Sequence, residues 1–125
     1  MPIAEFALVA LDCPEPAALA AFYQSIVGGE IKASTASAEW VRLQTPSGSD
    51  LGFQRDPGYT APEWPDGPPQ QAHLDFDVPD LDAGERAVIA LGAERATTQP
   101  SPDEWRVFTD PAGHPFCLCL VSGDD

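Results

Sequence analysis

Basic residues are scarce in this chain, which carries six Lys and Arg against 20 Asp and Glu and has a formal net charge of −14. The few basic residues are scattered along the sequence, so we expect no cationic face that could bind a phosphate backbone. Nucleic acids and anionic membrane surfaces are therefore excluded as predicted partners. The acidity favours solubility and does not identify a ligand.

Long apolar runs and a cysteine framework are also missing. No stretch approaches the roughly 18 apolar residues of a membrane-spanning helix, and the N-terminus lacks the basic start and apolar run of a signal peptide. The three cysteines, Cys13, Cys117 and Cys119, are an odd number. The last two share one predicted strand, a spacing that disfavours a disulfide. We expect reduced thiols in a cytoplasmic protein.

The chain does contain an internal repeat. Trp40-Val-Arg-Leu-Gln-Thr-Pro46-Ser-Gly48 aligns without a gap with Trp105-Arg-Val-Phe-Thr-Asp-Pro111-Ala-Gly113. Such a repeat indicates that one structural unit was used twice and that the copies share a core. The length fits a single domain over residues 1–125. We expect one module at about 3–55, a second at about 72–121, and a linker at 56–71.

Both modules show the same order of predicted elements. An apolar stripe at helical spacing predicts the first helix, which follows Asp12 and ends at Gly28-Gly29. Alternating residues predict the strands. The first module is expected to have strands near 3–11, 30–34, 38–45 and 50–55. The second is expected to have a helix at 80–91 and strands near 72–78, 93–98, 104–109 and 115–121.

The linker 56–71 holds five prolines, a density that excludes a helix or a central strand. We expect it to be extended and stiff. Trp64 lies on this segment. Its aromatic ring could cover a pocket, but an anchoring role is favoured.

The quoted segments resemble the vicinal oxygen chelate superfamily, which has the glyoxalase and bleomycin-resistance fold. The resemblance is carried by the strand that runs into Asp12, by Ala21-Phe22-Tyr23, by His73-Leu-Asp-Phe-Asp-Val-Pro-Asp80, and by Asp110-Pro-Ala-Gly113 before the last strand. It implies an α+β fold in which two tandem βαβββ modules form a curled mixed sheet around a cavity, with the helices outside. It also implies a homodimer.

The resemblance further implies where a metal would bind in members that use one. Those positions hold Glu5, His73 and Cys117, while Gly52 occupies the fourth. Carboxylate, imidazole and thiolate are competent ligands of Zn²⁺ and similar ions, so a divalent metal (Zn, Ni, Mn or Fe) is one alternative. Because Gly52 offers no ligand and the set is poor in oxygen, a metal-free cavity is favoured. We expect Glu5, His73 and Cys117 to project into one cavity that Gly52 widens.

Other candidates come from strand alternation. His73, Asp75 and Asp77 share one face of their predicted strand by the period-2 rule. His73 and Asp75 are therefore candidate catalytic residues. The alternative is that Asp75 and Asp77 lie at a solvated rim and that His73 is only hydrogen-bonded. Four further side chains are expected to line the cavity: Trp40, Gln54, Trp105 and Cys119.

Two classes of function follow. The chain is either a lyase or isomerase of the vicinal oxygen chelate type, with Glu5, His73 and Cys117 around a divalent metal, or a metal-free protein that sequesters a drug-like molecule. In both cases the partner is a small organic molecule in the cavity. The absence of Glu at positions 52 and 117 argues against glyoxalase I activity.

Overall fold

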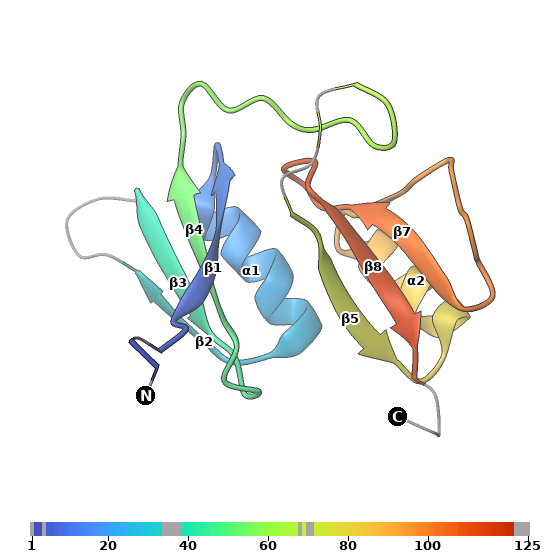
Figure 1. The fold of residues 1–125 in the computed structure, drawn as a ribbon, viewed down its shortest axis with the longest axis horizontal. Helices are drawn as coiled ribbons and strands as arrows, with labels where there is room; N and C mark the ends of the chain where they lie inside the picture. The colour runs from blue at the N-terminus through green and yellow to red at the C-terminus, as the bar shows by residue number, and fades with distance from the viewer. Residues whose placement is uncertain (1, 4, 34–38, 68, 70–71, 122–125) are drawn as a thin grey trace. The chain divides into compact units, whose positions relative to one another are not determined.

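The computed structural model describes residues 2–3, 5–33, 39–67, 69 and 72–121. It consists of two compact units, Met1–Tyr59 and Thr60–Asp125, and the boundary falls inside the predicted linker. Each unit runs strand, helix, strand, strand, strand, and Figure 1 shows one helix against one sheet in each. The predicted α+β class and the tandem βαβββ order are confirmed. None of the described helices has the length and apolar character needed to cross a membrane.

The first unit forms a four-stranded sheet in the order β1-β4-β3-β2. Its elements are β1 (Leu8–Cys13), α1 (Pro16–Val27), β2 (Glu30–Ala33), β3 (Trp40–Gln44) and β4 (Asp50–Arg55). β1 runs parallel to β4, and the other pairs are antiparallel. The prediction that this strand begins at residue 3 is wrong. Leu8 is in register with Asp50, the first residue of β4, so none of the described residues before Leu8 is paired with β4.

The core of the first unit lies between its sheet and α1. Alternate residues of β1, β3 and β4 are buried on that side, and Tyr23 of α1 stacks on Phe53 with ring centroids 5.8 Å apart. Burial of one such large side chain contributes about 1.5–3 kcal/mol. The helix begins at Pro16, because proline is tolerated in the first turn. It ends at Val27, and the next residue, Gly28, has a φ of 77° that a residue with a side chain rarely adopts.

The second unit repeats this arrangement in the order β5-β8-β7-β6. Its elements are β5 (Leu74–Val78), α2 (Leu81–Ala90), β6 (Glu94–Arg95), β7 (Trp105–Thr109) and β8 (Pro115–Leu120). β6 is shorter than the predicted strand 93–98. The Gln99 side chain accounts for this, since its amide donates to the Ala96 and Val107 carbonyls and accepts from the Val107 N–H. It supplies hydrogen bonds that a longer β6 would otherwise make.

Helix α2 covers one face of the second sheet. Asp80 caps the helix by accepting from the Ala83 N–H at 3.0 Å. Gly84 lies so close to the sheet that a Cβ there would be 3.1 Å from Leu118 Cδ1 and 3.4 Å from Val78 Cγ1. The side chains of β5 and β8 that alternate with Leu118 and Val78 therefore project from the opposite face. We call that opposite face of the second sheet the open face.

Candidate functional site

The open face brings together side chains from three strands. Register pairs Asp75 of β5 with Cys117 of β8, and Asp77 with Cys119. It also pairs Val107 of β7 with Cys117, and Trp105 with Cys119. The parallel pairing of β5 with β8 therefore places two carboxylates beside two thiols, with Trp105 on the far side of the thiols. Asp75 and Asp77 therefore share one face of β5, as predicted, and the apolar residues Leu74, Phe76 and Val78 share the other.

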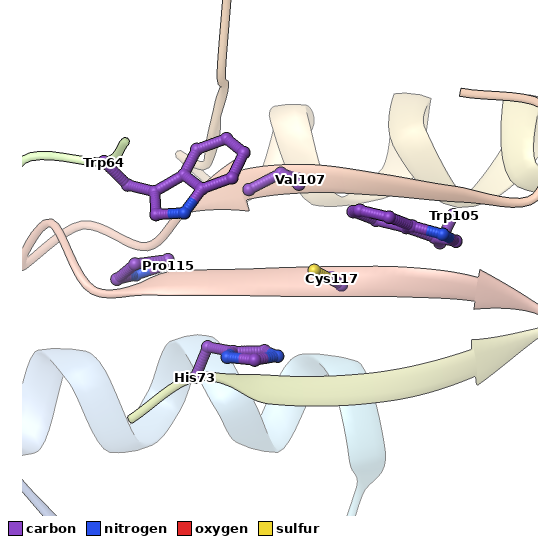
Figure 2. A pocket seen from close by; sticks show the side chains of 6 residues that line it. All are labelled: Trp64, His73, Trp105, Val107, Pro115 and Cys117. Atoms are coloured by element: carbon purple, nitrogen blue, oxygen red, sulfur yellow. The ribbon is translucent and has the colours of Figure 1, made fainter. Parts of the chain in front are cut away.

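A pocket of about 140 Å³ opens on this face. Figure 2 shows Trp64 and Trp105 toward opposite ends, with Cys117 between them and His73 along one side. Val107 and Pro115 complete the lining. Trp64 therefore lines a pocket. From the sequence, an anchoring role was favoured over this one. A second hollow of about 230 Å³ shares His73, Trp105 and Cys117 and adds Asp75 and Cys119.

Neither thiol of the open face is an activated nucleophile. Cys117 is buried at 7% exposure. Burial raises the pKa of its thiol to about 12, and the neighbouring carboxylate of Asp75 adds to the increase. The pKa of Cys119 is raised as well, first by burial and then by Asp75 and Asp77. Because the thiolate is the reactive form, both cysteines serve as small packing groups near neutral pH.

His73 lines both hollows, and Asp75 lines the larger one. His73 Nε2 is 3.5 Å from Asp75 Oδ1, and the two side chains are 46% and 57% exposed. A solvent-exposed pair of this kind contributes at most about 1 kcal/mol to stability. Both groups can therefore reach a ligand in the larger hollow without disturbing the core. The pair is placed where it could exchange a proton with a ligand, and its exposure also fits the alternative of a solvated rim.

The same two residues and Cys117 form a cluster of potential metal ligands. One ligand atom from each of His73, Asp75 and Cys117 lies within 4.8 Å of the others. Nitrogen, oxygen and sulfur donors suit Zn²⁺, which often keeps an open fourth position in catalytic sites. They do not form the oxygen-rich octahedron preferred by harder ions. The cluster therefore fits a zinc-like ion, provided that binding displaces the Cys117 proton.

The first unit differs at the position equivalent to Cys117. Gly52 is buried in β4, and the indole of Trp40 lies across it. A Cβ at Gly52 would overlap with Trp40 Cη2 and lie 2.7 Å from Cζ2. The expectation that Gly52 widens a cavity is wrong at this point, because the ring occupies the space that a side chain would take. Gln54 is in register with Trp40 and is exposed.

Residues 8–119 match the family model described as a glyoxalase-like domain. This chain belongs to the glyoxalase-like domain family. The match spans both units, from the first residue of β1 to Cys119 of β8. It confirms the resemblance that was drawn from the repeated strands and from the turn before the last strand.

Solved structures show the same fold. A glyoxalase/bleomycin resistance protein/dioxygenase family enzyme from Burkholderia phytofirmans is 23% identical, with a TM-score of 0.69 over 95% of this chain and 100% of its own. The fosfomycin resistance protein FosX from Listeria monocytogenes is 17% identical, with a TM-score of 0.70 over 98% of each chain. A glyoxalase/dioxygenase from Nostoc punctiforme is 21% identical, with a TM-score of 0.65 over 94% of this chain and 91% of its own. No curated protein matches significantly. These likenesses establish the fold of this glyoxalase-like chain and leave its activity to be inferred from its own residues.

The structure distributes the predicted site residues of this glyoxalase-like chain over both units. Glu5 lies in the first unit, exposed and ahead of β1. His73 and Cys117 lie in the second, where the structure brings them together with Asp75. Asp75 was named from the sequence only as a catalytic candidate. That Glu5 shares a cavity with His73 and Cys117 stays a prediction.

Two lining residues were not named from the sequence at all. Val107 lies two residues after Trp105, and Pro115 lies two residues before Cys117, so each shares a face with a residue that was named. The period-2 rule would have found both. Trp105 and Cys119, which were expected to line a cavity, do line the larger hollow.

Proposed function

We propose that this chain binds a small organic molecule that carries an apolar ring, and that it does so in the pocket of the second unit without a resident metal. The pocket of about 140 Å³, with an indole toward each end, carries the proposal. An apolar cavity of about 150 Å³ accommodates benzene, so this pocket has room for one six-membered ring. Indole faces also favour offset stacking against an aromatic ligand.

The chemistry of the lining favours binding over covalent catalysis. Cys117, the one potential nucleophile at the centre of the pocket, keeps its proton because burial raises its pKa to about 12. The remaining pocket surface is formed largely by indole, proline and valine side chains. A ligand with about nine non-hydrogen atoms is expected to bind with a Kd of about 1 mM, since such contacts contribute about 0.3–0.5 kcal/mol per atom.

Titration with 2-phenylethanol tests this proposal. We expect progressive shifts of the Trp64 and Trp105 indole N–H resonances in heteronuclear NMR spectra, while resonances of the exposed face of α2 stay in place. Trp105→Ala should weaken binding about tenfold because it removes one wall. Trp105→Phe, which keeps a ring, is the matched control and should retain most of the affinity. Unchanged affinity in Trp105→Ala would exclude this pocket as the site.

A metal-dependent lyase or isomerase is the second candidate, and the cluster of His73, Asp75 and Cys117 favours it. These three residues would hold a zinc-like ion. A bound ion of this kind can polarise the oxygens of a substrate. The cluster also places His73 and Asp75 beside the pocket, where they could orient a substrate or move a proton.

Elemental analysis by mass spectrometry separates the two candidates. We expect less than a tenth of an equivalent of Zn, Ni, Mn or Fe in untagged protein purified without chelators. A stoichiometric metal that Cys117→Ser and Asp75→Asn both remove would establish the metal-dependent alternative instead. Isomerisation of the hemithioacetal of methylglyoxal and glutathione is expected to be absent in either case.

A further inference from the structure

We infer that the pocket of the second unit selects organic cations, so that its ligand combines an apolar ring with a protonated amine. This inference rests on the proposed function, because it concerns the charge of the molecule bound there. The observation behind it is the charge distribution around the pocket. Carboxylates lie on the open face, whereas the arginines of this unit lie on or against α2.

The carboxylates come from β5. Asp75 lines the larger hollow together with Trp105, Cys117 and Cys119. Asp77 is two residues further along the same face and is in register with Cys119. Both carboxylates are exposed, so they are in contact with water and available to a ligand. They set a negative potential at the mouth of an otherwise apolar pocket.

The three arginines of the second unit do not neutralise this potential. Arg106 contacts Asp82 of α2 at 2.9 Å and Glu85 at 3.3 Å. Arg95 contacts Glu85 at 3.6 Å, and Arg86 is itself part of α2. In this unit, where every Lys and Arg position is described, each cation therefore lies on or against the helix. An anionic ligand would therefore find no lysine or arginine of this unit on the open face. The one basic side chain that lines both hollows is the imidazole of His73, and it contacts the Asp75 carboxylate at 3.5 Å.

The aromatic lining strengthens the preference for a cation. Trp105 lines both the pocket and the larger hollow, and Asp75 lines the larger hollow as well. Tryptophan is the most favourable aromatic partner for an ammonium group, which it attracts within about 6 Å of its ring. A ring in the pocket and an amine in the larger hollow would thus place the charge between an indole and a carboxylate. A carboxylate tail in the same place would be repelled.

Three ligands with the same ring test the inference: phenethylammonium, 2-phenylethanol and phenylacetate, each titrated by calorimetry and NMR in the presence of a chelator. We expect phenethylammonium to bind about three- to tenfold more tightly than 2-phenylethanol, and phenylacetate to bind more weakly than the alcohol. Raising the salt concentration from about 10 mM to about 150 mM should reduce the advantage of the cation and leave the alcohol unaffected.

Variants then locate the charges responsible. Asp75→Asn and Asp77→Asn should each lower the ratio of the affinity for the cation to the affinity for the alcohol about threefold. The double variant should bring the ratio close to one. Asp82→Asn removes a carboxylate from α2 and serves as the matched control, which should keep the wild-type ratio. Far-UV circular dichroism establishes that each variant is folded.

The possible failures are distinguishable. If none of the three ligands binds, the proposed function itself is wrong. If the alcohol binds but the cation shows no advantage, or if phenylacetate binds best, the cation inference is wrong while the pocket stands. A cation advantage that persists in the double variant would also overturn it, since the charge would then be recognised elsewhere.

Discussion

Replacement of Gly52 by alanine tests the contact between β4 and Trp40. The new Cβ would overlap with Trp40 Cη2 and lie 2.7 Å from Cζ2 and 3.1 Å from Leu8 Cδ1. Favourable carbon–carbon contacts are about 3.5–4.0 Å, so the indole must move away from the sheet. Because Gly52 is buried between β1 and β3, the backbone has little room to yield.

The expected cost follows from two opposing contributions. Overpacking a well-filled site costs about 1–3 kcal/mol. Alanine recovers about 0.5–1 kcal/mol relative to glycine in a strand, because the unfolded glycine is more flexible. Gly52→Ala should therefore lower the free energy of unfolding by about 1–2 kcal/mol, which corresponds to a decrease in Tm of about 4–8 °C for a protein of this size.

Urea denaturation followed by circular dichroism measures this change. Gly58→Ala is the matched control, since the nearest atom to its new Cβ is Asp56 Oδ1 at 3.6 Å, and it should change stability by less than about 0.5 kcal/mol. In a Trp40→Leu background the cost of Gly52→Ala should disappear. If alanine at position 52 is equally costly in both backgrounds, contact with the indole is not the cause.

Three further changes probe the second unit. Asp80→Ala removes the cap of α2 and should lower the free energy of unfolding by about 1 kcal/mol in urea denaturation, whereas Asp80→Ser should retain most of it. Asp110 is buried and accepts hydrogen bonds from two backbone N–H groups of its turn. Asp110→Ala should lower the free energy of unfolding by about 2 kcal/mol in thermal unfolding, and Asp110→Asn should lower it clearly less. Equal losses in the two variants would contradict this account. Because the pKa of Cys117 is raised to about 12, its thiol keeps a proton in the folded state that the unfolded chain loses near pH 8.5. Wild-type stability should therefore fall relative to Cys117→Ala as pH rises from about 9 toward about 12, and a parallel pH dependence of the two would refute the shift.

The repeat made most of the fold predictable. It gave the order of elements in both modules, because strands and helices each leave a periodic apolar pattern in the sequence. The ends of strands were harder to predict, since they depend on partners far away in the chain. β1 begins at Leu8 because β4 begins at Asp50, and β6 is short because Gln99 replaces part of its pairing with β7.

For the candidate site, the face on which each side chain lies was predictable, but its neighbours on other strands were not. Alternation placed His73, Asp75 and Asp77 on one face, but the sequence does not encode the register that sets Asp75 beside Cys117. Nor does it show that Trp40 lies across Gly52 while its counterpart Trp105 lines a pocket. Both depend on side-chain directions between strands, which a single sequence leaves open.

The pairing of the first and last strands of each unit has a mechanical consequence. β1 is parallel to its neighbour β4, as β5 is to β8, so the two ends of each unit leave its sheet in opposite directions. A force that stretches the chain therefore acts along these strands, and it loads all hydrogen bonds of the pair together. In this shear geometry the hydrogen bonds cannot break one after another, as they would in an unzipping geometry. An unfolding machine that pulls on either end would meet its main resistance at these two parallel pairs.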